Sequence, residues 1–117
     1  MFDRLEIFDL ASTRARHAAA RQAVVAQNIA NADTPGYRAR DVNDFAETYR
    51  ALQGGNGPAD GRLPIRTVDA GGPESPNGNS VSLEIEMLRG IEAQRAHSRA
   101  LQVYGSAMNI LRTSLGR

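Results

Sequence analysis

The side chains in this sequence that could do chemistry are two histidines and two neighbouring glutamates. His17 and His97 are far apart in the chain, and no motif supplies the converging partners that a metal site or an acid–base pair would need. We therefore expect both histidines on a helix surface or at an interface. Glu84 and Glu86 fall in the first turn of an expected helix, where the helix dipole favours negative charge, which explains them better than a catalytic pair. No catalytic residue, metal site, cofactor or small-molecule substrate is predicted.

Two asparagines form a second candidate group. Asn28 and Asn31 are three residues apart, which places them on one side of a helix. They could hydrogen-bond to backbone or to neighbouring chains where the helix meets the following turn. They could also simply end the helix, since asparagine tolerates the left-handed conformation found at helix C-termini. Both interpretations remain open from the sequence, and so does the choice between a register role and a surface role for Gln22 and Gln94.

The residues that follow these asparagines predict a turn. Thr34 precedes a proline and is therefore pushed toward an extended conformation. Pro35 and Gly36 suit the two central positions of a type II turn, in which the second central residue needs a positive φ. Tyr37 is expected to anchor the turn against a helix, with its hydroxyl group hydrogen-bonded or in contact with water.

Two long helices must position these residues. The first is expected over residues 1–32, where neither glycine nor proline occurs, and the second over residues 82–117, with Ser82 as its N-cap. In each helix a row of residues alternates three and four apart, as in the seam of a coiled coil. The first seam comprises Phe8, Ala11, Ala15, Ala18, Gln22, Val25 and Ile29, and the second comprises Met87, Gly90, Gln94, His97, Leu101, Tyr104, Met108, Leu111 and Leu115.

The middle segment, residues 33–81, has a different character. Val42, Phe45, Ala46 and Tyr49 have helical spacing and predict a short helix after an extended stretch. Residues 54–79 are rich in glycine, proline and asparagine and are expected to be mobile, with one possible short strand at residues 63–68. The predicted fold is mainly α: long N- and C-terminal helices pair as an antiparallel, coiled-coil-like hairpin around a short, largely irregular middle.

Composition indicates that such a hairpin needs partners. Hydrophobic residues make up 41% of the 117, but many are alanines and aromatic residues are only 5%, so little apolar area is available for burial within one chain. The net charge of +1 argues against strong non-specific binding to nucleic acid or anionic membranes. The sequence contains no cysteine, and it shows neither a secretory signal nor an apolar run long enough to cross a bilayer.

Three stretches resemble the bacterial flagellar rod and hook proteins. Residues 26–37, AQNIANADTPGY, are similar to the signature in which an N-terminal helix ends in an Ala-Asn-rich turn followed by Thr-Pro-Gly-Tyr. Residues 78–87 and 108–117 resemble the start and the end of the C-terminal helix in the proximal-rod members of the family. The match departs from those members at Ser82, where aspartate is frequent, and in a shorter middle richer in glycine, which leaves other small rod subunits open.

The resemblance implies a structural subunit of the flagellar basal body that assembles with copies of itself and with other rod proteins into a torque-transmitting tube. It also implies export without a cleaved signal through the flagellar type III apparatus, a periplasmic location, and contacts with the rod-base adaptor and the membrane ring. In the family the terminal helices form the core of the tube and are largely disordered in isolated subunits. The alternative is a small helical adaptor or export chaperone of the same system. A nucleic-acid-binding protein and an enzyme fit the sequence less well.

Overall fold

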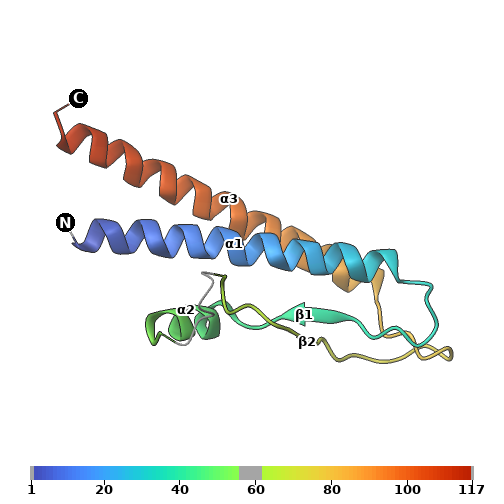
Figure 1. The fold of residues 1–117 in the computed structure, drawn as a ribbon. Coiled ribbons are helices and arrows are strands. Elements are labelled where there is room, and N and C mark those ends of the chain that lie inside the picture. The colour runs from blue at the N-terminus through green and yellow to red at the C-terminus, as the bar shows by residue number, and fades with distance from the viewer. Residues whose placement is uncertain (1, 56–61, 117) are drawn as a thin grey trace.

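Two long antiparallel helices dominate the structure, a computed structural model that describes residues 2–55 and 62–116. They are α1, Phe2–Ala30, and α3, Leu83–Ser114. Between them lie β1, Arg40–Val42, α2, Phe45–Gln53, and β2, Thr67–Asp69. Figure 1 shows α1 and α3 diverging toward the chain ends, with α2, β1 and β2 below α1 in the view and both chain ends at the same end of the molecule. The expected mainly α hairpin is confirmed.

Each long helix begins and ends close to where the sequence predicts. α1 ends at Ala30, two residues earlier than expected, where the Asn31 N–H donates to the Gln27 and Asn28 carbonyl oxygens at 3.1 Å each. α3 begins after Ser82, whose extended backbone and side-chain oxygen, 3.4 Å from the Ile85 nitrogen, make it the predicted N-cap.

Residues spaced seven apart, most of them alanines, make the contact between the two long helices. On α1 the buried residues of this contact are Ala11, Ala18 and Val25, and on α3 they are Glu86, Ala93 and Ala100. A β-carbon placed on Gly90 would lie 3.6 Å from Val25 Cγ1, so the helices approach closely there. Toward the chain ends, the rings of Phe8 and Tyr104 meet edge to face with their centroids 5.0 Å apart. Alanine and glycine therefore allow close packing but bury little apolar area.

The contact face of α3 coincides with only half of the predicted seam. Gly90, His97 and Leu111 are half-buried, as a seam position next to α1 should be, whereas Met87 and Gln94 are exposed. The positions one residue earlier, Glu86 and Ala93, are buried instead. Large side chains would hold the helices apart, so the intramolecular face follows the small residues, and the larger residues beside it remain accessible.

The middle segment contains more regular bonding than its composition predicts. β1 and β2 pair antiparallel, with Asp41 opposite Val68, and α2 forms where the helical spacing indicated. β2 overlaps the end of the predicted strand 63–68. Residues 75–79 form a turn in which the Ser75 N–H donates to the Asn79 carbonyl oxygen at 2.8 Å. Residues 56–61, part of the stretch expected to be mobile, lie outside the described residues.

Candidate assembly site

Asn28 lies at the centre of the end where α1, β1 and α3 meet. Its side chain is completely buried, and its Nδ2 donates to the Arg40 carbonyl oxygen at 2.7 Å and to Glu86 Oε1 at 2.9 Å. Its Oδ1 accepts from the Tyr37 hydroxyl at 3.0 Å and from the Arg40 N–H at 3.1 Å. An asparagine side chain has two donors and two acceptor positions, and all four are used here. We call these four residues the Asn28 clamp.

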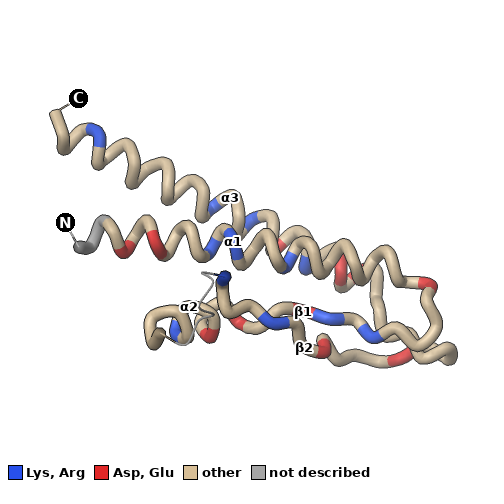
Figure 2. The backbone as a smooth tube through the Cα atoms, viewed as in Figure 1, with Lys and Arg blue, Asp and Glu red and all other residues tan. Residues whose placement is uncertain are grey.

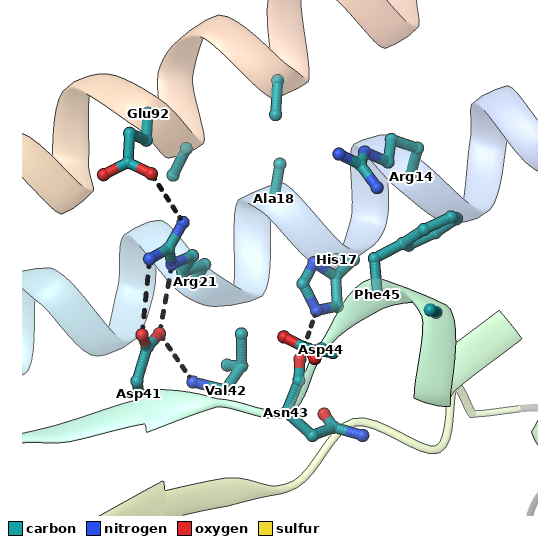
Figure 3. Close-up of a pocket in the computed structure, with 13 residues that line it drawn as sticks. Arg14, His17, Ala18, Arg21, Asp41, Val42, Asn43, Asp44, Phe45 and Glu92 are labelled. Carbon is teal, nitrogen blue, oxygen red and sulfur yellow. Dashed lines mark hydrogen bonds and ion pairs between the residues drawn. The ribbon is translucent and has the colours of Figure 1, made fainter. Parts of the chain in front are cut away.

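A chain of charged side chains continues from the clamp. Glu86, 1% exposed, accepts a second hydrogen bond from Arg89 at 2.8 Å. Arg89 Nε lies 3.7 Å from Asp41 Oδ2, and Arg21 Nε lies 3.1 Å from Asp41 Oδ1. Arg21 also lies 3.8 Å from Glu92, as the dashed lines in Figure 3 show in part. The series links α1, β1 and α3, so three elements distant in sequence share one electrostatic network.

The predicted turn has the expected geometry. Gly36 has φ +76°, and the Tyr37 N–H donates to the Thr34 carbonyl oxygen at 3.2 Å, as in a type II turn. Asn31 braces this turn, because its Nδ2 donates to the Gln27 carbonyl oxygen at 2.9 Å and its Oδ1 accepts from Thr34 Oγ1 at 3.0 Å. Pro35 precedes Gly36 in the turn and is exposed.

Sequence reasoning missed the second half of this arrangement. Asn79, only 2% exposed, donates from Nδ2 to the carbonyl oxygens of Asn31 at 2.9 Å and Thr34 at 2.7 Å. Ser80 Oγ accepts from the Ala39 N–H at 2.8 Å. The signal lay in the Asn-Gly-Asn run before α3, which resembles any flexible loop by composition. The Asn79 side-chain amide finds its backbone partners only in the folded chain, where the end of α1 and the start of α3 lie together.

His17 is buried inside the chain, with 9% of it exposed, rather than on a helix surface or at an interface as the sequence predicted. His17 Nε2 donates to the Asn43 carbonyl oxygen at 2.7 Å, and its ring lies 5.6 Å, centroid to centroid, from that of Phe45. The Arg14 guanidinium also lies over the Phe45 ring, 4.5 Å from its centre (Figure 3). His97 is half-buried on α3. Within residues 2–55 and 62–116 no cluster of histidine and acidic side chains could hold a metal ion.

Charged residues of both signs are spread along the molecule rather than gathered in one patch (Figure 2). At the far edge of the β1–β2 pair, Arg38 Nε bonds to Asp69 Oδ2 at 2.7 Å, and Arg38 also pairs with Glu74. The hydrogen bond from Arg38 lowers the pKa of Asp69, with a further contribution from the Gly71 N–H, and the same hydrogen bond raises the pKa of Arg38. These pairs are exposed, so solvent screens them and they contribute little to stability.

Comparison with known proteins places the chain in a family. It is 30% identical over 115 aligned residues to flagellar basal body rod protein FlgB of Salmonella typhimurium, covering 80% of this chain and 83% of that protein. The chain belongs to the flagellar basal body rod protein family. A family model described as flagella basal body rod protein matches residues 8–38. That stretch contains Asn28 and the whole turn from Asn31 to Tyr37, so the family match falls on the clamp end of α1.

Other rod family relatives match shorter stretches at higher identity. Flagellar basal body rod protein FlgB of Escherichia coli is 57% identical over 37 residues, which is 32% of this chain and 27% of that protein. The protein of the same name from Agrobacterium fabrum is 47% identical over 47 residues, 40% of this chain and 35% of that protein. These two alignments therefore span about a third or less of each relative. Residues 2–55 and 62–116 include no helix with the length and apolar run that crossing a membrane requires.

The predicted seam residues divide into two sets in this rod family chain. Val25 is buried, and Phe8, Met108 and Leu111 are half-buried. The exposed set comprises Ile29, Met87, Leu101, Tyr104 and Leu115, whose exposed fractions range from 39% to 70%. The chain by itself leaves these large apolar side chains accessible to water. An exposed apolar surface of this extent on a small helical protein is typical of a site of contact with other chains.

Proposed function

We propose that this protein is a structural subunit of the bacterial flagellar rod and that it acts by packing rather than by catalysis. One observation carries the proposal beyond family membership: large apolar side chains remain exposed along both long helices, while the polar family signature is satisfied inside the chain. The polar groups at the clamp end thus have their partners within the chain. The flanks, by which we mean the exposed sides of α1 and α3, have apolar side chains that no part of the described chain covers. Contacts with neighbouring subunits would cover the flanks and join the helices into a stiff tube.

The partners follow from this role. Copies of the same chain and other rod proteins would cover the helices of residues 1–32 and 82–117, and the middle, residues 33–81, would lie outside that core. Contact with the rod-base adaptor and the membrane ring, passage through the flagellar export apparatus and a final periplasmic location belong to the same proposal. We assign the subunit to the proximal part of the rod, because residues 78–87 and 108–117 resemble the proximal-rod members of the family.

Deleting the gene from the source bacterium tests the function. We expect non-motile cells whose basal bodies lack the rod, and restored swimming when the unmodified gene is supplied in trans. Swimming cells with complete rods after the deletion would refute the proposal. Sedimentation distinguishes a rod subunit from the alternative, a small adaptor or export chaperone. A closed dimer whose size does not increase with concentration would support the alternative. A subunit with uncovered flanks should instead form larger species as the concentration rises.

A further inference from the structure

A groove lies between the two long helices toward the chain ends. Figure 1 shows that α3 diverges from α1 in this direction. Its volume is about 550 Å³, and Phe45 of α2 contributes to its wall. Ile7 and Leu10 of α1 and Val103 of α3 give it an apolar lining. We call it the open groove. It spans about two helical turns, because residues 7–14 of α1 and 96–103 of α3 contribute to it and each such run rises about 10 Å.

Two arginines in the lining of the open groove have no acidic partner. Arg14 contacts the Phe45 ring, and neither Arg14 nor Arg99 makes an ion pair with any residue that the structure describes. Elsewhere in the described chain Arg21, Arg38 and Arg89 are paired with carboxylates. The open groove therefore combines an apolar interior with two uncompensated positive charges, which favours an apolar segment that carries an acidic side chain.

A complementary surface lies on the outer side of α3 at its other end. Glu84, Met87, Leu88 and Ile91 have the spacing of one helical face, and all four are exposed, with Met87 at 62% and Leu88 at 61%. This face points away from Glu86 and the α1 contact. The Glu84 carboxylate makes no hydrogen bond or ion pair with described residues. We call these four residues the outer patch, and the patch also spans about 10 Å along the helix.

We propose that the outer patch of one copy docks in the open groove of a second copy, with Glu84 facing Arg99 and Arg14. The two surfaces agree in length, in apolar character and in charge. This inference rests on the proposed function, since it names which faces of successive subunits meet.

Other described surfaces fit the groove less well. The end of α3 exposes Ile110 and Leu115, but its charged residue there is Arg112, which would add positive charge to positive charge. The start of α1 carries Glu6 and Asp9, but its apolar side chains Ile7 and Leu10 already line the groove of their own chain. The outer patch, by contrast, offers three exposed apolar side chains and an unpaired carboxylate on one helical face that does not line the groove.

The position of the two surfaces determines the kind of assembly. The outer patch lies near the Asn28 clamp and the open groove near the chain ends, so a contact between them is head to tail. A head-to-tail contact leaves a free patch on one copy and a free groove on the other, and it continues as an open helical array unless the rotation closes a ring. The proposed contact therefore predicts growth by addition rather than a closed dimer.

Engineered cysteines test the contact directly, because the natural chain contains none. The variant carries Leu10→Cys in the groove and Leu88→Cys in the patch. Leu88 lies 12 residues along α3 from Ala100, which lines the same groove as Leu10, so the two engineered thiols are separated by roughly 18 Å within one chain and cannot join. Oxidation should therefore produce a ladder of disulfide-linked multimers. The matched control is Leu10→Cys with Asn109→Cys, an exposed position on α3 outside the patch that lies nine residues, roughly 13 Å, along the helix from Ala100.

The experiment is run in the source bacterium carrying only the variant gene and on the purified full-length chain. We expect a ladder of three or more rungs from the groove–patch variant, at least fivefold stronger than from the control. Monomers alone, a single dimer band, or equal ladders from both variants would overturn the proposed contact. Swimming cells with complete rods but without a ladder would overturn the contact while leaving the proposed function intact. If the unmodified gene, supplied to the same deletion strain, restores no rods, the proposed function is refuted, and the purified chain then decides the contact separately.

Charge reversal provides a second test that does not depend on disulfide formation. Arg99→Glu should abolish or reduce swimming at least tenfold, and adding Glu84→Arg to the same chain should restore it, because the pair is then reversed rather than lost. The control is Arg16→Glu, at an exposed α1 position that does not line the groove, and cells carrying it should swim normally. Circular dichroism checks that each variant keeps its helices. Failure of the reversed pair to restore swimming, with helices intact, would contradict the assignment of Glu84 to Arg99.

Discussion

Different interactions hold α1 and α3 together at the two ends of the helical pair. At the clamp end, Asn28, Glu86 and the turn satisfy one another with directional hydrogen bonds inside one chain. At the chain-terminal end, the helices separate around the open groove and one aromatic contact, Phe8 with Tyr104, joins them. The first arrangement fixes geometry, and the second leaves apolar area for a neighbour. The clamp end therefore supplies most of the geometry that holds the subunit together, whereas the chain-terminal end supplies the groove half of the proposed contact.

Replacing Asn28 should damage the clamp end most. In Asn28→Ala, the Glu86 carboxylate and the Arg40 backbone lose buried partners, and we expect about 3 kcal/mol less stability. Urea unfolding followed by circular dichroism measures the loss. Gln27→Ala, at the neighbouring exposed position, is the control and should change the free energy by less than about 0.5 kcal/mol. Equal losses in the two variants would show that the clamp does not hold the helices.

Enlarging a residue between the helices should cost less. Ala93, 1% exposed, lies in the contact between the helices, so Ala93→Leu should push α1 and α3 apart and destabilise the chain by about 2 kcal/mol. Gln94→Leu places the same side chain on the exposed neighbour and should stay within about 0.5 kcal/mol. Thermal melting of both variants decides the matter. An unchanged melting temperature for Ala93→Leu would mean that the helices are not closely packed there.

One substitution in α2 should stabilise the chain. Thr48 is completely buried and its hydroxyl oxygen has no hydrogen-bond partner among the described residues. Thr48→Val keeps the shape and removes the unsatisfied group, so we expect a gain of about 1 kcal/mol. Thr67→Val, on the exposed strand β2, serves as the reference and should be near neutral. A loss of stability in Thr48→Val would mean that the hydroxyl group has a partner in solution.

Truncating an exposed residue of the predicted seam should separate stability from assembly. Leu101 is 53% exposed, so Leu101→Ala should change the unfolding free energy of the isolated chain by less than about 0.5 kcal/mol. Swimming should nevertheless fall, because a neighbouring subunit would lose apolar contact. Urea unfolding and a soft-agar assay give the two values. Normal swimming would remove Leu101 from the proposed interface.

The smallest expected effect is that of Asp69 on acid stability. Because Arg38 lowers the pKa of Asp69 in the folded chain, the carboxylate contributes stability above its ordinary pKa of 3.8, and that stability disappears as the pH falls through the lower folded value. Asp69→Asn should therefore flatten the dependence of the urea midpoint on pH below about 4, while Asp9→Asn, which has no described partner, should not. If the urea midpoint depends on pH in the same way in the wild type and in Asp69→Asn, the Arg38–Asp69 pair contributes no measurable stability.

The sequence predicted the elements better than the contacts between them. The limits of α1 and α3, the Ser82 cap and the Pro35-Gly36 turn depend on local backbone preferences, which neighbouring residues determine. Local preferences do not determine which face of α3 is buried. The apolar spacing predicted Met87 at the contact, whereas Ala93 is buried there because a small residue allows the helices to pack closely. Small size, not hydrophobicity, was the relevant property.

The polar part of the site shows the same limit. Asn28 and Asn31 were identified, but Asn79 and Glu86 were not, since the first stood in a loop-like run and the second resembled an ordinary helix start. Their roles depend on residues about 50 positions away in the sequence. The proposed rod function came from resemblance to a family and not from periodicity, which would fit any pair of helices that needs partners.

The clamp also has a mechanical consequence. It lies near one end of a molecule 63 Å long, and Tyr104 is 18 residues beyond Glu86 on α3, which corresponds to about 27 Å along the helix. A change of ten degrees in the angle between the helices at the clamp would move the far end of that lever by roughly 5 Å. A tube built from such subunits would adapt to bending or load by movement of the chain-terminal ends of α1 and α3, while the hydrogen bonds of the Asn28 clamp stay intact.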